Sequence, residues 1–157
     1  MAHNLRQLAP EAMSDRSNTR PRPASVRESA PARYGTAFTP ETVRRGLPVR
    51  ALDQLAQLLQ VDRAELARVV GVSLRTLQRK SGEKQRLAPA PSDRLARVRR
   101  ILDLAADVLG EQRKGALWLT SKNRALGGEV PLGMLDTDMG TLQVQQELHQ
   151  IEFGFPF

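Results

Sequence analysis

A short stretch of the sequence concentrates side chains that can hydrogen-bond to nucleic-acid bases. Its hydroxyl, amide and guanidinium groups belong to Ser73, Arg75, Thr76, Gln78 and Arg79. Arginine can pair bidentately with guanine, and glutamine with adenine. Lys80 and Lys84 follow, and lysines there suit phosphates, which fix the register of a protein on a duplex. This pattern predicts a surface that recognises DNA.

Two short helices joined by a tight turn are expected to position these side chains. Helices are predicted over Arg63–Val70 and Leu74–Lys80, with Gly71 in the turn and Ser73 as the N-cap of the second helix. The apolar residues recur at three- and four-residue spacing, at Leu66, Ala67, Val70, Val72, Leu74 and Leu77. The pattern favours a helix-turn-helix; the alternative is a plain helical hairpin with a solvated charged face.

The charge distribution supports a polyanionic partner for the front of the chain. Residues 1–100 carry 20 Lys and Arg against 9 Asp and Glu, a balance of +11. Residues 101–157 carry 4 against 8, a balance of −4, and the two sum to the net charge of +7. A basic front and an acidic back predict two partners of different kinds.

The sequence offers little that could perform catalysis or bind a metal. It has no cysteine, its two histidines, His3 and His149, are isolated, and the motifs HExxH, GxGxxG and the P-loop are absent. We therefore expect a protein that is not an enzyme and has no cofactor. No run of about 18 apolar residues and no signal-peptide pattern is present, so we expect a cytoplasmic protein without a membrane span.

The overall prediction is an all-α chain in three parts. Residues 1–40 are rich in Pro, Ser and Arg and are expected to form a disordered basic arm, which either touches DNA or is a solvated tail. Residues 41–110 are expected to hold the helix-turn-helix and a long linking helix. Residues 111–157 are expected to form a small helical domain, and residues 38–48 to dock locally through their apolar side chains.

The remaining helices are predicted from apolar spacing and from their end signals. They are expected over residues 50–60, from Ser92 to Leu109, over 114–126, after Pro131, and over 138–153. Pro89 and Pro91 are expected to keep the preceding segment out of a helix. In the last helix, the residues assigned to the apolar face are Met139, Leu142, Val144, Leu148 and Ile151.

The C-terminal block resembles a known family. The stretch WLTSKNRALGGEVPLGMLDTDMGTLQVQQELHQIEFGFPF resembles the toxin-binding domain of Xre/MbcA/ParS-type antitoxins. The residues that carry the resemblance are Trp118, Leu119, Asn123, Leu126, Gly127, Gly128, Pro131, Leu132, Leu135, Thr137, Gly140, Val144, Leu148, Ile151, Glu152 and Gly154. With the upstream helix-turn-helix, the resemblance covers roughly residues 45–157. It departs at Lys122, where the family often has proline.

The resemblance implies an antitoxin of a type II toxin–antitoxin system. It implies a RES-domain toxin partner that consumes NAD⁺, whose active-site entrance the C-terminal region covers. It also implies operator DNA as a second partner, repression of the shared operon, and a homodimer within a larger complex. The alternative reading is a stand-alone helix-turn-helix regulator whose C-terminal part dimerises or senses a ligand.

The C-terminal residues themselves are consistent with a binding surface. Two adjacent glycines permit a sharp reversal, and an apolar FGFPF terminus with the acidic Glu147 and Glu152 suits a basic partner cleft. The alternatives are that these phenylalanines fold back or make a homodimer contact. The expected toxin-binding residues are Asn123, Gly127, Gly128, Pro131, Leu135, Glu152, Phe153, Gly154, Phe155 and Phe157.

Overall fold

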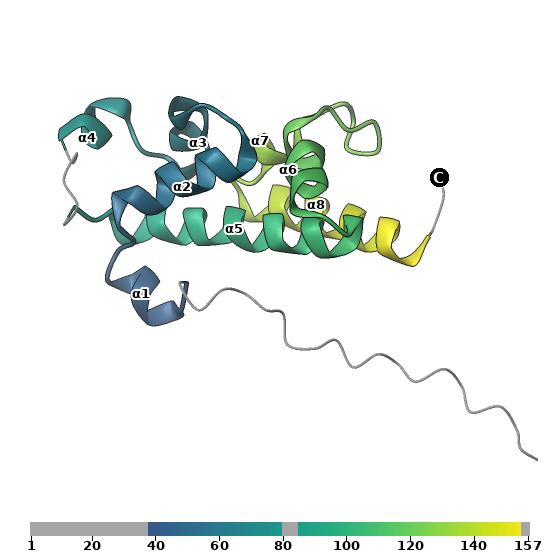
Figure 1. The fold of residues 1–157 in the computed structure, drawn as a ribbon, viewed down its shortest axis with the longest axis horizontal. Helices are drawn as coiled ribbons and strands as arrows, with labels where there is room; N and C mark the ends of the chain where they lie inside the picture. Colours follow the sequence, from purple (N-terminus) through teal and green to yellow (C-terminus); the bar gives the residue numbers. More distant parts are fainter. Residues whose placement is uncertain (1–37, 80–84, 155–157) are drawn as a thin grey trace, which may run out of the picture. The chain divides into compact units, whose positions relative to one another are not determined.

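A computed structural model describes residues 38–79 and 85–154, and all their regular elements are helices (Figure 1). They are α1 Pro40–Arg44, α2 Val49–Leu59, α3 Arg63–Val70, α4 Leu74–Arg79, α5 Pro89–Leu109, α6 Gln112–Thr120, α7 Pro131–Met134 and α8 Asp138–Phe153. The all-α prediction is confirmed for these ranges. The arm predicted over residues 1–40 lies outside them except for its last three residues, as do Lys80, Lys84, Phe155 and Phe157. None of the helices in these ranges is long and apolar enough to cross a membrane.

Helix α5 is the element on which most of the others pack. Its C-terminal part lies against α6, and it also contacts α1, α3 and α8 (Figure 1). Leu95, Val98, Ile101 and Leu102 are fully buried along it, at the three- and four-residue spacing of one helix face. One helix therefore supports both the helix-turn-helix and the C-terminal helices.

The start of α5 differs from the prediction. Pro89 and Pro91 lie inside its first turn instead of keeping that segment out of a helix. Proline is tolerated there because the first backbone N–H groups of a helix have no partner within it. Ser92 is therefore not the N-cap. It lies fully buried one turn into the helix, where its hydroxyl donates to the Ala88 carbonyl at 2.9 Å.

The same hydroxyl fastens the segment before α2 to α5. The Leu47 N–H donates to the Ser92 Oγ at 2.8 Å. The backbone of this segment also pairs with residues 85–87, because the Leu87 N–H donates to the Leu47 carbonyl at 2.8 Å and the Val49 N–H to the Gln85 carbonyl at 3.0 Å. Leu47 itself is buried, which confirms that the segment before α2 docks locally.

A further difference from the prediction concerns α6, which ends at Thr120 and does not continue to residue 126. The residues after it form a loop closed by backbone bonds from Asn123 N–H to the Glu129 carbonyl at 3.0 Å and from Gly128 N–H to the Asn123 carbonyl at 2.8 Å. Helix α7 begins at Pro131 as predicted, and Thr137 caps α8, its hydroxyl accepting from the Gly140 N–H at 3.1 Å.

Candidate functional site

The turn between α3 and α4 is formed by a glycine in the left-handed region. Gly71 has a φ of +74°, and its N–H donates to the Arg68 carbonyl at 3.2 Å. The Val72 N–H donates to the Ala67 carbonyl at 2.8 Å. These bonds satisfy carbonyls that the end of α3 would otherwise leave unpaired. The predicted bounds of α3 and the role of Gly71 are confirmed.

An arginine from α5 supports this turn from outside. The Arg94 Nη1 lies 3.4 Å from the Val70 carbonyl oxygen at the end of α3. Its guanidinium occupies the space that a side chain on Gly71 would need. A cation at the C-terminus of a helix is stabilised by the helix dipole. Helix α5 therefore holds the turn that orients α4.

Helix α4 is anchored by one buried residue and by its N-cap. Leu77 is almost fully buried and is the only buried residue of α4. The Thr76 N–H donates to the Ser73 Oγ at 3.1 Å, and the two hydroxyl oxygens lie 2.8 Å apart. Ser73 is thus confirmed as the N-cap. Leu74, expected among the apolar contacts, is instead exposed because the short helix turns only Leu77 toward the core.

Three of the predicted base-reading side chains are accessible. Arg75, Gln78 and Arg79 are exposed on α4, and within the described ranges none of them has an ion pair. Ser73 and Thr76 also lie on α4 or at its start, but their hydroxyls already contact each other. The helix thus presents two guanidinium groups and one amide to solvent, which is the chemistry that pairs with guanine and adenine.

The loop between α6 and α7 is organised by Asn123. Its side-chain Oδ1 accepts from the Ala125 N–H at 2.9 Å, as in an Asx turn. Gly127 and Gly128 follow with φ of +70° and +84°, and a side chain on either would meet no atom within 4 Å. Both glycines are therefore required by backbone conformation and not by space, which agrees with the predicted reversal.

Two of the expected toxin-binding residues are buried. Pro131 begins α7, and Leu135 is fully enclosed after it. Both side chains therefore pack inside the chain, at the start and just after the end of α7. Helix α7 in turn lies close against α8, because Gly140 leaves room for the Met134 carbonyl.

The face of α8 that enters the core differs from the prediction. The buried positions are Gly140, Thr141, Val144, Glu147 and Leu148. Met139 and Leu142, which were expected on the apolar face, are 69% and 47% exposed. Glu147, which was expected to face a partner, lies on the buried side. The three- and four-residue spacing of the small and apolar residues from 140 to 148 is the signal that identifies the buried face.

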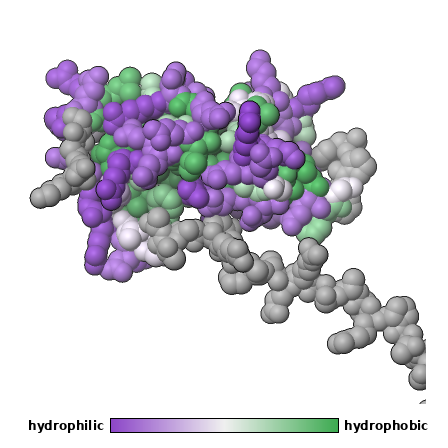
Figure 2. Space-filling view, in the orientation of Figure 1, coloured by the Kyte–Doolittle hydropathy of each residue, from purple (hydrophilic) through white to green (hydrophobic). Residues whose placement is uncertain are grey.

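Helix α8 therefore leaves an apolar set of side chains in solvent. Met139, Leu142 and Phe153 share one side of the helix by their 100° spacing, and Phe153 is 70% exposed. Figure 2 shows hydrophobic residues at the surface around the C-terminal end of α8. Glu152 and the αL residue Gly154 are exposed beside Phe153. We call Met139, Leu142 and Phe153 the α8 apolar face.

The described residues hold no group of three or more acidic or histidine side chains that could bind a metal ion.

Two family models match the chain. The Antitoxin Xre-like helix-turn-helix domain matches residues 40–100, and the Antitoxin Xre/MbcA/ParS C-terminal toxin-binding domain matches residues 104–154.

Curated relatives extend along most of the chain. An Antitoxin Xre from Yersinia enterocolitica serotype O:8 / biotype 1B is 30% identical over 125 residues, which are 79% of this chain and 84% of the relative. The chain belongs to the Xre antitoxin family. A second Antitoxin Xre, from Photorhabdus laumondii subsp. laumondii, is 32% identical over 71% of this chain and 76% of the relative. A third, from Pseudomonas putida, is 38% identical over 54% and 53%.

Family membership assigns the two exposed surfaces, on α4 and on α8, to two different domains. The chain is an antitoxin with a helix-turn-helix domain and a toxin-binding domain, from a family of toxin-binding proteins that are not enzymes. The two matched segments meet within α5, the helix that packs against elements of both. The exposed side chains Arg75, Gln78 and Arg79 of α4 belong to the first segment, and the α8 apolar face belongs to the second.

Proposed function

We propose that this antitoxin neutralises a RES-domain toxin that degrades NAD⁺, by covering the active site of the toxin with its C-terminal region. We further propose that it represses its own operon through the helix-turn-helix, as a homodimer within a larger toxin–antitoxin complex in the cytoplasm. The match of residues 104–154 to a toxin-binding domain favours this proposal over a stand-alone transcriptional regulator.

The observation that carries the toxin-binding half is the α8 apolar face. Fully burying a side chain such as Met, Leu or Phe stabilises a complex by about 1.5–3 kcal/mol relative to exposure. Met139 and Phe153 are each more than two-thirds exposed in the described chain, so most of that free energy is still available. Exposed aromatic side chains also anchor many protein interfaces. A partner that covers the α8 apolar face would bind with the free energy of burying these side chains.

Electrostatics favour an acidic end directed at a basic cleft. Glu152 is exposed next to Phe153, whereas Glu147 is buried and is withdrawn from the proposed contact. A toxin site that accepts a dinucleotide needs cationic side chains for the phosphates. The exposed carboxylate of Glu152 complements such a site, and residues 101–157 have a charge balance of −4 from 4 basic and 8 acidic residues.

A truncation tests the toxin-binding half. Deleting residues 153–157 should release the NAD⁺-degrading activity of the toxin because the exposed Phe153 and the phenylalanines after it are lost, while operator binding stays largely intact. Phe153→Ala should weaken neutralisation in the same direction, and Gln143→Ala, a change of an exposed polar residue on the same helix, serves as the control. Full neutralisation by the truncated chain would refute the assignment.

A second experiment tests the DNA-binding half. Changing Arg75 and Arg79 to Ala should lower operator affinity by about 1–3 kcal/mol for each lost base pairing and leave toxin binding unchanged. Changing Arg113 and Lys114 to Ala removes two exposed cationic side chains on α6 and controls for the loss of two positive charges. A gel-shift titration that gives equal operator affinity for the double variant and the control would argue against α4 as the recognition helix.

A further inference from the structure

The exposed side of α8 carries a sequence repeat that extends beyond the α8 apolar face. Residues 139, 142, 146, 149 and 153 follow one another at intervals of three, four, three and four, which is the spacing of the a and d positions of a coiled coil. All five side chains are exposed, and they are Met139, Leu142, Gln146, His149 and Phe153. We call these five residues the α8 seam.

The seam lies on the side of α8 that does not enter the core. The residues of α8 that are buried against the rest of the chain are Gly140, Thr141, Val144, Glu147 and Leu148, and none of them belongs to the seam. Side chains at a and d spacing form a stripe along which a second helix can pack lengthwise. Helix α8 is therefore packed on one face and keeps a second helix-packing face in solvent.

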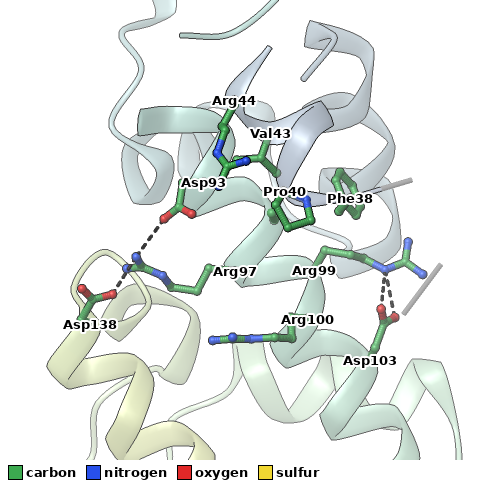
Figure 3. Close-up of a pocket in the computed structure, with 11 residues that line it drawn as sticks. Phe38, Pro40, Val43, Arg44, Asp93, Arg97, Arg99, Arg100, Asp103 and Asp138 are labelled. Atoms are coloured by element: carbon green, nitrogen blue, oxygen red, sulfur yellow. Dashed lines mark hydrogen bonds and ion pairs between the residues drawn. The ribbon is translucent and has the colours of Figure 1, made fainter. Parts of the chain in front are cut away.

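Ion pairs hold the start of the seam in place. Asp138, the first residue of α8, binds the Arg97 Nη2 at 2.7 Å, and Arg97 also binds Asp93 at 3.1 Å (Figure 3). Both Arg97 and Asp93 belong to α5, and the Arg97 side chain is only 15% exposed. Because α8 is fixed to α5 in the free chain, a partner that binds the seam need not order this helix first.

The middle of the seam is polar. Gln146 and His149 occupy one a and one d position, and within the described residues neither side chain makes a hydrogen bond or an ion pair. A polar residue at such a position weakens helix pairing but specifies its register and its partner. The seam therefore favours one matched helix over indiscriminate apolar association.

The charges of α8 distinguish a toxin helix from a second copy of α8. The helix carries Asp138, Glu147 and Glu152 and neither Lys nor Arg. Asp138 and Glu152 lie directly beside the seam, at positions that often form ion pairs with a partner helix. A second copy would bring the same carboxylates without a cation to meet them. The seam also spans only two heptads, fewer than the three or four that indicate a free-standing coiled coil, so the partner helix should belong to a larger surface.

We propose that the α8 seam packs lengthwise against an amphipathic helix of the toxin. That helix presents apolar side chains to Met139, Leu142 and Phe153 and has Lys or Arg beside them. This inference rests on the proposed function and adds the kind of surface that the toxin presents. It requires that substitutions on α8 act according to their heptad position.

Two adjacent glutamines test this requirement, because residue 146 lies in the seam and residue 145 lies beside it. The measurement is a calorimetric titration of the full chain with a RES-domain toxin. Gln146→Glu should lower the affinity about tenfold or more, since the new charge would be enclosed among apolar side chains. Gln145→Glu should bind as tightly as wild type or more tightly, and Gln145→Lys about two- to fivefold more weakly, because basic residues beside the toxin seam attract the first and repel the second.

Truncation of apolar side chains provides a second comparison. Leu142→Ala should lower the affinity about tenfold or more, because the apolar contact with the toxin helix is lost. Ile151 is 37% exposed and lies on the opposite side of α8 by its 100° spacing, so Ile151→Ala should bind the toxin as wild type does. Thermal unfolding of both variants checks that they remain folded.

The outcomes separate this proposal from the proposed function. If wild type binds the toxin but Gln145→Glu and Gln146→Glu change the affinity equally, or if Leu142→Ala binds as Ile151→Ala does, the helix pairing is wrong and toxin binding stands. If Gln146→Glu changes the mass of the antitoxin alone in analytical ultracentrifugation, the seam pairs with a second copy, and the proposal is again overturned. If wild type binds no RES-domain toxin, both proposals fail.

Discussion

Replacing Ser92 with alanine tests how the segment before α2 is fastened to α5. The Ser92 side chain is fully buried, and its Oγ accepts from the Leu47 N–H at 2.8 Å. Alanine removes this acceptor and leaves an N–H group enclosed by the core. The Ala88 carbonyl also loses the hydrogen bond from the Ser92 hydroxyl, but it still accepts from the Ser92 backbone N–H at 3.0 Å.

The expected cost follows from that single unpaired donor. Leaving a buried N–H without a partner costs about 1–3 kcal/mol. The described ranges 38–79 and 85–154 hold 42 and 70 residues, 112 in all, so their unfolding entropy near the melting temperature is about 0.24 kcal/mol per kelvin. A loss of about 2 kcal/mol should therefore lower the melting temperature by about 8 °C.

Thermal unfolding followed by circular dichroism measures this change. The control is Ser121→Ala, because Ser121 is exposed after α6 and makes no side-chain hydrogen bond within the described residues. Ser121→Ala should melt within about 1–2 °C of wild type, as surface substitutions usually do. If Ser92→Ala melted as Ser121→Ala does, the Leu47 N–H would not depend on this hydroxyl, and the reasoning would be refuted.

Two further predictions concern the contact of α7 with α8 and a buried carboxyl. Gly140→Ala should lower stability by about 1–3 kcal/mol because the new methyl group would overlap a backbone carbonyl of α7, whereas Gly133→Ala, with no atom within 4 Å, should not; equal urea midpoints would contradict this. Burial raises the pKa of Asp103, so the folded chain holds that proton more tightly than the unfolded chain, and stability should fall as pH rises through the raised pKa. Asp103→Asn should flatten this part of the pH profile, and an unchanged slope would count against it.

Local signals were enough to predict the helix-turn-helix. The bounds of α3, the turn at Gly71 and the cap at Ser73 depend on residues close together in the chain, and the structure confirms all three. The end of α8 at Gly154 is of the same kind, since a glycine in the left-handed region closes the helix. Such features need no knowledge of distant contacts.

The structure differs from the prediction where contacts between distant parts of the chain determine the local conformation. Ser92 has the residue type of an N-cap, but its role depends on Leu47, 45 residues earlier. The face of α8 depends on contacts with α5 and α7, which bury Glu147 and leave Met139 in solvent. Apolar residue type alone therefore predicted the wrong side for part of this helix. The support of Gly71 by Arg94 was likewise beyond the reach of local patterns.

The central claim is that the C-terminal region of this antitoxin binds and silences a RES-domain toxin. The most direct measurement is co-purification of the chain with a RES-domain toxin produced in the same cells, followed by an NAD⁺-consumption assay of that toxin with and without the antitoxin. The account predicts a stable complex and suppression of NAD⁺ loss at stoichiometric antitoxin. A RES protein that neither co-purifies nor slows its NAD⁺ consumption would contradict it.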